Sequence, residues 1–298
     1  MRKIYLILFV PLLLNSAFAI NPEKEYYLKP EWYNIMYDEI SFITIDGYKL
    51  KGWFYPAQDS SEILLTGDTT LCKKKYKLID DVKRPTIIIC DGDAQNMSWL
   101  IWYAKQLITK GFNVFTFDWR GFGESDNWPT ERDYLSYPEF LLDYDAAVEY
   151  VKSRKEVDNS KIGVFGFSTG AYLSFAISVK RNDISAFAGR ALLTSFNDVL
   201  PILKKLAPSR NLVPPPNYPV ELEPINAAEK INIPVFLIVG EKDNRTPVWM
   251  SEKIKSKIKS HCDLWIIPNA EHGGANSPEW IANEEFFKRL ALFFKKYL

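Results

Sequence analysis

The hydrophobic pattern of the chain changes once along its length. Around residues 41–45 and 48–55, apolar and polar positions alternate on either side of Asp46-Gly47. Alternation across an Asp-Gly turn predicts an antiparallel hairpin. Later apolar positions form short, mostly unbroken runs, which are typical of strands buried on both faces. These runs cover residues 84–90, 113–118, 161–167, 189–194, 234–240 and 263–268.

Helix-length segments separate the runs. In them, apolar residues recur at spacings of three and four, over residues 97–110, 138–154, 169–180, 248–259 and 279–297. Strands that alternate with helices predict a mostly parallel sheet with helices on both faces. We therefore expect an α/β fold in which the hairpin forms an antiparallel edge, and a single domain over residues 20–298.

Two segments interrupt this alternation. Residues 57–84 are largely polar and predict a surface loop between the hairpin and the next strand. Residues 197–230 are rich in proline. Because proline lacks a backbone N–H and cannot continue a sheet or a long helix, we expect a short irregular cap over one end of the sheet.

The N-terminus has the order of a secretory leader. A basic start precedes an apolar stretch, and residues 17–19 read Ala-Phe-Ala, a small-x-small cleavage site. This order predicts a signal peptide over residues 1–19 that is cleaved after Ala19. The alternative is an uncleaved anchor, but the apolar residues 4–14 are fewer than the roughly 20 that a spanning helix needs. We expect an exported protein, periplasmic or secreted, with no stable membrane span after cleavage.

Composition narrows the classes of partner. The chain has 37 Lys and Arg residues and 37 Asp and Glu residues, so no net basic charge favours nucleic acid. Two histidines and three widely separated cysteines (Cys72, Cys90 and Cys262) do not match zinc-site spacing, and no glycine-rich stretch has phosphate-loop spacing. We expect no metal and no dissolved cofactor. The sequence leaves the oligomeric state and any disulfide open.

A candidate nucleophile lies in Gly166-Phe167-Ser168-Thr169-Gly170, where a predicted strand passes into a predicted helix. A serine at such a turn is exposed, and glycines two positions away on each side avoid side-chain clashes. The helix N-terminus adds unpaired N–H groups and a positive dipole, which stabilise an oxyanion. Small residues also occur at strand-to-helix turns for packing alone. A catalytic interpretation of Ser168 therefore requires a base and an acid elsewhere in the chain.

The two histidines differ in position. His272 follows the strand at 263–268, at the carboxyl end where active sites of parallel sheets gather. His261 precedes that strand and fits a surface position. His272 is therefore the candidate base that removes the serine proton, and we expect activity to fall in acid.

The acid that orients the base has three candidates. Asp243 follows the strand at 234–240 and is favoured over its neighbour Glu241 and over the more distant Asp198. With Asp243, the chain order is serine, aspartate, histidine, which is the α/β-hydrolase order.

Four motifs carry a resemblance to a known family. They are FDWRGFGES at 117–125, the stretch 146–170 that ends in GFSTG, VGEKDNRTP at 239–247 and NAEHGG at 269–274. With these motifs, roughly residues 40–297 resemble the α/β-hydrolase superfamily, in its serine-aminopeptidase-like and dienelactone-hydrolase-like branches. The resemblance implies an α/β-hydrolase fold with Ser168 as nucleophile, His272 as base and Asp243 as acid. Arg120 in the first motif is interpreted as a residue that fixes its loop through salt bridges.

The resemblance also implies an oxyanion hole. Its donors would be the N–H of Thr169 and that of Asp93, in the loop CDGDAQN. Asp91 stands where relatives usually carry histidine. A carboxylate at Asp91 or Asp93 that faced the site would oppose the oxyanion, so we expect these side chains to point away or catalysis to be weakened.

These residues predict a serine hydrolase of the carboxylesterase type, which forms an acyl-enzyme on Ser168. An ester is the favoured substrate, with thioester and amide as alternatives, and the partner is a small acyl compound. Two other functions fit the sequence: an acyltransferase that uses the same triad, and a non-catalytic binding protein that keeps the fold.

Overall fold

The computed structural model describes residues 20–64, 72–79, 81–130 and 133–298. For residues 60–64 and 72–76 it describes the backbone alone. The predicted signal peptide lies outside the described residues. In this part of the chain, no helix is both long and apolar enough to cross a bilayer.

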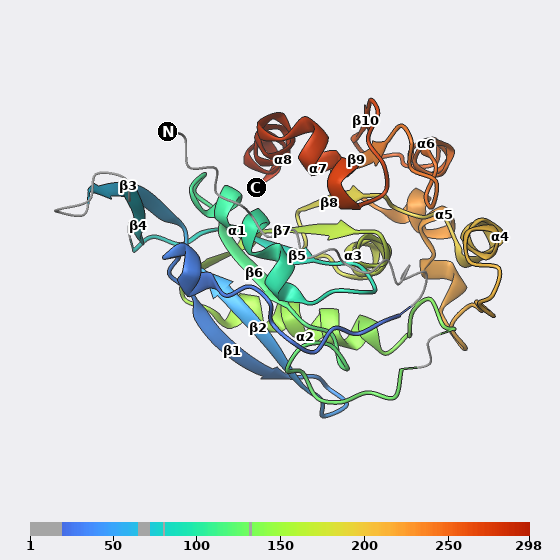
Figure 1. Cartoon of the computed structure of the whole chain (residues 1–298), viewed down its shortest axis with the longest axis horizontal. Helices are drawn as coiled ribbons and strands as arrows, with labels where there is room; N and C mark the ends of the chain where they lie inside the picture. The colour runs from blue at the N-terminus through green and yellow to red at the C-terminus, as the bar shows by residue number, and fades with distance from the viewer. Residues whose placement is uncertain (1–19, 65–71, 80, 131–132) are drawn as a thin grey trace, which may run out of the picture.

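The centre of the protein is an eight-stranded sheet with the order β1-β2-β6-β5-β7-β8-β9-β10 (Figure 1). β1 and β2 form the predicted hairpin at one edge, and β2 pairs antiparallel with β6. All later pairs are parallel, which confirms the expected sheet. The strands are β1 (Asp38–Ile43), β2 (Lys49–Tyr55), β5 (Arg84–Cys90), β6 (Asn113–Phe117), β7 (Val157–Phe167), β8 (Ala186–Arg190), β9 (Val235–Gly240) and β10 (Cys262–Ile267).

Helices cover both faces of this sheet, as the periodicity predicts. One apolar cluster joins the sheet to α1 (Ile101–Ile108) and α8 (Glu284–Tyr297), and the other joins it to α2 (Phe140–Ser153), α3 (Thr169–Lys180) and α6 (Val248–Lys255). The remaining elements are η1 (Pro30–Tyr33), η2 (Met97–Leu100), α4 (Phe196–Leu206), η3 (Val220–Leu222), α5 (Pro224–Ala227), η4 (Ala228–Lys230), η5 (Gly274–Asn276) and α7 (Pro278–Ala282).

Three predicted elements need correction. Residues 57–84 are not only a loop, because β3 (Gln58–Leu64) and β4 (Cys72–Leu78) pair as a small antiparallel sheet. The predicted strand at 189–194 is displaced: β8 ends at Arg190, and Ala191 has a φ of 57° that turns the chain out of the sheet. The predicted helix at 279–297 is divided at Asn283, whose φ is 45°.

The proline-rich cap lies at the end of the molecule opposite β3 and β4 (Figure 1). It begins with a regular helix, α4, although Pro201 lies inside it. The Ser195 side chain accepts a hydrogen bond from the N–H of Asp198 and caps this helix. Beyond α4 the cap contains only helical pieces of three or four residues, so the prediction of irregular backbone holds for its second part.

Arg120 fixes the loop that follows β6. Its side chain is fully buried and binds Asp143 of α2 at 2.7 Å and Asp46 of the hairpin turn at 2.6 Å. The guanidinium also lies over the rings of Tyr48 and Trp128. This arrangement confirms the structural interpretation of Arg120.

Candidate active site

Ser168 lies at the turn between β7 and α3, with a φ of 52° and a ψ of −120°. The glycines around it are needed for close packing. A Cβ atom on Gly170 would lie 2.0 Å from the carbonyl oxygen of Asp91, and one on Gly166 would lie 2.6 Å from the Cα of Ala171. The strained turn therefore depends on both glycines, and it holds the serine hydroxyl at the carboxyl end of β7.

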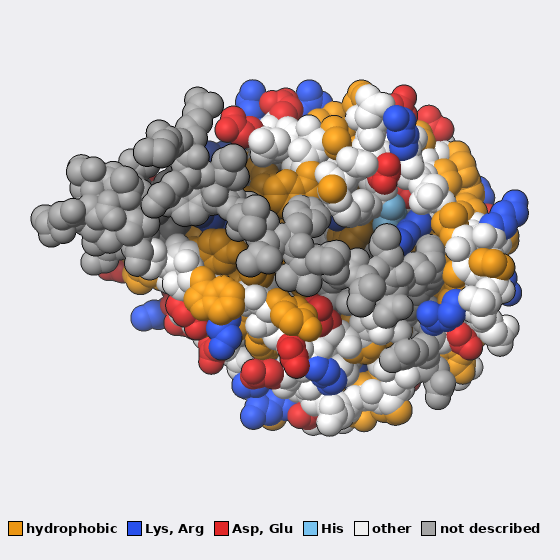
Figure 2. All heavy atoms as spheres, viewed as in Figure 1, with side chains coloured by type: hydrophobic (Ala, Val, Ile, Leu, Met, Phe, Trp, Pro, Cys, Tyr) orange, Lys and Arg blue, Asp and Glu red, His pale blue; other side chains and the backbone are white. Residues whose placement is uncertain are grey.

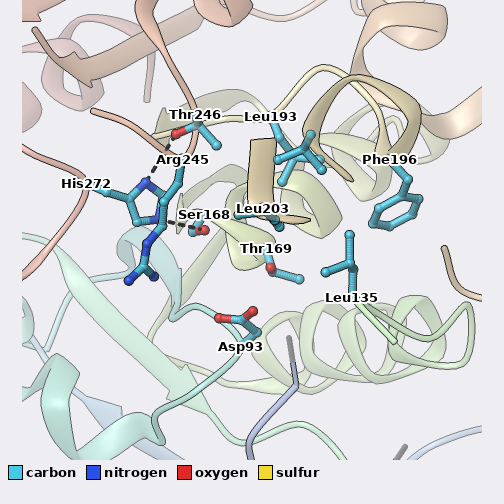
Figure 3. Close-up of a pocket in the computed structure, with 11 residues that line it drawn as sticks. Asp93, Leu135, Ser168, Thr169, Leu193, Phe196, Leu203, Arg245, Thr246 and His272 are labelled. Carbon is cyan, nitrogen blue, oxygen red and sulfur yellow. Dashed lines mark hydrogen bonds between the residues drawn. The ribbon is translucent and has the colours of Figure 1, made fainter. Parts of the chain in front are cut away.

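His272 reaches this serine from the loop after β10. Its Nε2 lies 3.1 Å from Ser168 Oγ (Figure 3). The backbone carbonyl of His272 accepts a hydrogen bond of 2.9 Å from the buried Arg190 side chain, which extends from the end of β8. Arg190 thus holds the backbone of His272, and one ring nitrogen is directed at the Ser168 hydroxyl.

Asp243 lies behind the imidazole, at the carboxyl end of β9. Its two carboxylate oxygens are 2.9 and 3.0 Å from His272 Nδ1. They also accept hydrogen bonds from the backbone N–H groups of Arg245 and Thr246 and from the Thr246 hydroxyl. Burial opposes ionisation of Asp243, but His272 and these donors outweigh it and hold the pKa of this carboxyl below its ordinary value.

The other candidates lie in different surroundings. His261 is exposed and lies 2.9 Å from Asp263. Glu241 accepts a hydrogen bond from the N–H of Asn269. Asp198 binds the Thr194 hydroxyl and the Lys253 ammonium. The structure therefore brings Ser168, Asp243 and His272 into one hydrogen-bonded chain, and these hydrogen bonds of the alternatives do not reach it.

The predicted oxyanion residues face the same cavity. Thr169 and Asp93 line it together with Ser168 and His272. Burial raises the pKa of Asp91 to about 7 and that of Asp93 to about 6. One oxygen of Asp91 turns back to accept a hydrogen bond of 2.7 Å from the N–H of Gly92. Near neutral pH the Asp91 carboxyl is therefore partly protonated, whereas the Asp93 carboxyl is mostly charged.

The cavity has a volume of about 30 Å³ and two different walls. One wall is polar and consists of Asp93 and Arg245, which lie on the same side of Ser168 in Figure 3. The other wall is apolar and comes from the cap and neighbouring loops, with Leu135, Leu193, Phe196, Val199 and Leu203. The site therefore combines a hydroxyl, an imidazole and a small apolar pocket.

The sequence profile of the prolyl oligopeptidase family matches residues 98–298, about two thirds of the chain. The chain belongs to the prolyl oligopeptidase family. Ser168, Asp243 and His272 all lie within the matched residues. The chain is therefore a hydrolase by family, in agreement with the resemblance inferred from its motifs.

Individual relatives extend this result. Protein YfhR of Escherichia coli, which is uncharacterized, is 29% identical over 278 residues, covering 91% of this chain and 87% of YfhR. Among solved structures, an esterase of Pyrococcus furiosus is 21% identical, with a TM-score of 0.71 and coverage of 93% of this chain and 99% of the esterase. The acylaminoacyl peptidase of Pyrococcus horikoshii is 16% identical, with a TM-score of 0.66, and covers 89% of this chain and 42% of that one. These structures share the α/β-hydrolase fold.

The surface of this family member is mixed in charge. Figure 2 shows acidic and basic side chains interspersed over the described part of one face. Among the described residues on that face, no broad basic patch is visible.

Sequence reasoning missed several residues of the site. Thr246 donates to Asp243 and lies 3.3 Å from His272 Nδ1, and it falls within the motif VGEKDNRTP. Arg190 left no such signal, because its role depends on His272, which is 82 positions away. The apolar wall from α4 was also missed, because residues 197–230 were predicted to be an irregular proline-rich cap without a helix.

Proposed function

We propose that this prolyl oligopeptidase family member is a serine hydrolase that cleaves small esters through an acyl-enzyme on Ser168. The contact of 3.1 Å between Ser168 Oγ and His272 Nε2, at the wall of a cavity, carries the proposal. His272 would take the serine proton while Oγ attacks the ester carbonyl, and Asp243 would hold the required tautomer. His272 would then give this proton to the leaving alcohol.

The oxyanion of the tetrahedral intermediate would lie between the N–H groups of Thr169 and Asp93. Donors that belong to the backbone need little reorganisation during such a reaction. Water activated by His272 would then attack the acyl-enzyme and regenerate the Ser168 hydroxyl. An acceptor other than water would make the same residues an acyltransferase.

The pocket favours a short acyl group. A cavity of about 30 Å³ holds only a few heavy atoms, and its apolar wall suits an unbranched hydrocarbon. A longer acyl chain would extend past the apolar wall toward the open side of the cavity, where it would gain fewer contacts. We therefore expect acetate and butyrate esters to be cleaved faster than octanoate esters.

The test is hydrolysis of a p-nitrophenyl ester series, acetate to octanoate, by the chain that begins at Ile20 and by its Ser168→Ala variant. We expect the variant to lose activity by about 10⁴-fold or more. Ser256→Ala, on the surface at the end of α6, is the matched control and should keep full activity. Equal rates for Ser168→Ala and the parent would refute the acyl-enzyme on Ser168.

Amide cleavage is the second candidate. Membership of a peptidase family favours it, and the same triad would serve. Aminoacyl p-nitroanilides assayed beside the esters decide between the two: a higher kcat/KM for the anilides would make the protein a peptidase. No turnover of either class, in folded protein, would favour the non-catalytic alternative.

We also propose that the protein is exported and cut after Ala19. The basic, apolar and small-x-small order of residues 1–19 supports this. N-terminal sequencing of the exported protein should begin at Ile20, and a mature form that still carried residues 1–19 would contradict it.

A further inference from the structure

The segment that follows the predicted leader bridges two loops of the active site. The N–H of Ile20 donates to the carbonyl of Tyr134 at 3.2 Å, and the N–H of Asn21 donates to the carbonyl of Asp93 at 2.8 Å. Both loops reach the cavity, through Leu135 and through Asp93 itself. The Ile20 side chain is fully buried, so this end of the segment is anchored in the core.

The same segment holds the loop after β5 further along. The Glu23 carboxylate accepts a hydrogen bond of 2.5 Å from Trp99 Nε1. The Asn96 side chain donates to the backbone carbonyl of Glu25 at 2.7 Å. The loop that carries Asp93 is thus attached to the segment before and after its turn into η2.

Tyr26 connects the same segment to the end of β6. Its hydroxyl donates to Asp118 at 2.6 Å, and the other oxygen of Asp118 accepts the N–H of Met97 at 2.7 Å. Asp118 directly follows β6, the neighbour of β5 in the sheet. The segment is therefore joined to the oxyanion loop both directly and through the sheet.

Helix α3 limits this loop from the opposite side. The approach of Gly170 to the carbonyl of Asp91 leaves no room for a Cβ atom. The backbone of Asp91–Asp93 is consequently held between α3 and the N-terminal segment. Removal of either support would let the Asp93 N–H move relative to Ser168.

We propose that Ile20–Tyr26 is a positioning segment of the active site, which holds the Asp93 N–H where the oxyanion of the intermediate forms. This inference rests on the proposed function and deepens it. It also gives a reason for the predicted cleavage point. A chain that begins at Ile20 keeps the N–H of Asn21 and has an α-ammonium donor at Ile20, whereas a chain that begins at Pro22 lacks both donors.

The test removes one hydrogen-bond donor, the backbone N–H of Asn21. Asn21→Pro deletes the N–H that binds Asp93, and Asn21→Ala keeps it and is the matched control, since the Asn21 side chain is exposed. A displaced oxyanion donor should lower kcat by about 10- to 100-fold with KM within about twofold. Asn21→Ala should match the parent. If Asn21→Pro fails to fold, a chain that begins at Pro22 serves in its place with the same expectation.

A trifluoromethyl ketone separates positioning from general loosening. This inhibitor forms a tetrahedral adduct with a reactive serine, so its affinity depends on the oxyanion donors as the transition state does. Its Ki should rise in Asn21→Pro by the same factor by which kcat/KM falls. An unchanged Ki, or a change in KM alone, would overturn the positioning role. A parent protein that forms no adduct at Ser168 would instead refute the proposed function.

Discussion

Two clusters in this protein each join a buried aspartate to a nitrogen-bearing side chain, and they differ in what surrounds them. Arg120 binds Asp143 and Asp46 and joins the β6 loop, α2 and the hairpin turn. His272 binds Asp243 on one side and Ser168 on the other. The Arg120 cluster faces packed aromatic rings, whereas one nitrogen of His272 faces a hydroxyl at a cavity.

The difference shows when a buried hydrogen-bonded pair supports chemistry. In the Arg120 cluster the partners are on three elements and are directed at each other, so the cluster fixes their relative position. In the His272 cluster, Asp243 holds one ring nitrogen and leaves Nε2 directed at Ser168. A buried pair thus fixes the elements that it joins when all its partners bind one another. It supports proton transfer when one of its atoms remains directed at a reactant.

The largest expected effect comes from Asp243→Asn. An amide there would favour the wrong imidazole tautomer, and we expect kcat to fall by about 10⁴-fold with little change in thermal stability. Steady-state hydrolysis of p-nitrophenyl acetate and a thermal melt measure both quantities.

Asp198→Asn is the control for this variant, because Asp198 binds Lys253 and Thr194 instead of His272. It should keep most of the activity. The reverse result, with Asp198→Asn inactive and Asp243→Asn active, would transfer the acid role to Asp198.

The second effect concerns the cluster around Arg120. Arg120→Met leaves the fully buried Asp143 without its cation, so the free energy of unfolding should fall by about 3–5 kcal/mol. Urea unfolding measures this loss, and kcat per folded molecule should stay near that of the parent. Lys259→Met, which removes an exposed pair with Glu229, should cost less than about 1 kcal/mol. An Arg120→Met variant that was stable but inactive would remove the contrast between the two clusters.

The smallest effect is a pH dependence at the oxyanion loop. Burial raises the pKa of Asp93 to about 6, so this carboxyl is mostly neutral below that pH and charged above it. The charge that opposes the oxyanion therefore appears as pH rises. The ratio of kcat/KM for Asp93→Asn to that of the parent should increase by about two- to threefold between pH 5 and pH 8. A ratio independent of pH would mean that the carboxyl does not act on the oxyanion.

The fold was predictable from the sequence where the hydrophobic pattern was unambiguous. Buried strands such as β5 and β9 read as apolar runs because both of their faces are covered. β8 was misplaced because the apolar run continues through Ala191–Thr194, which is buried outside the sheet. The pairing of β3 with β4 was missed because the sequence of this segment is largely polar, which predicts a surface loop.

The sequence by itself determined the chemistry that is available: a serine between glycines at a strand-to-helix turn, and an aspartate and a histidine after two later strands. Only the tertiary structure decided which carboxylate meets His272, because the choice depends on the order of strands in the sheet. The contact of Asn21 with Asp93 was also outside the reach of sequence reasoning. That contact joins a backbone N–H to a backbone carbonyl, groups that almost every residue carries, so no side chain marks it.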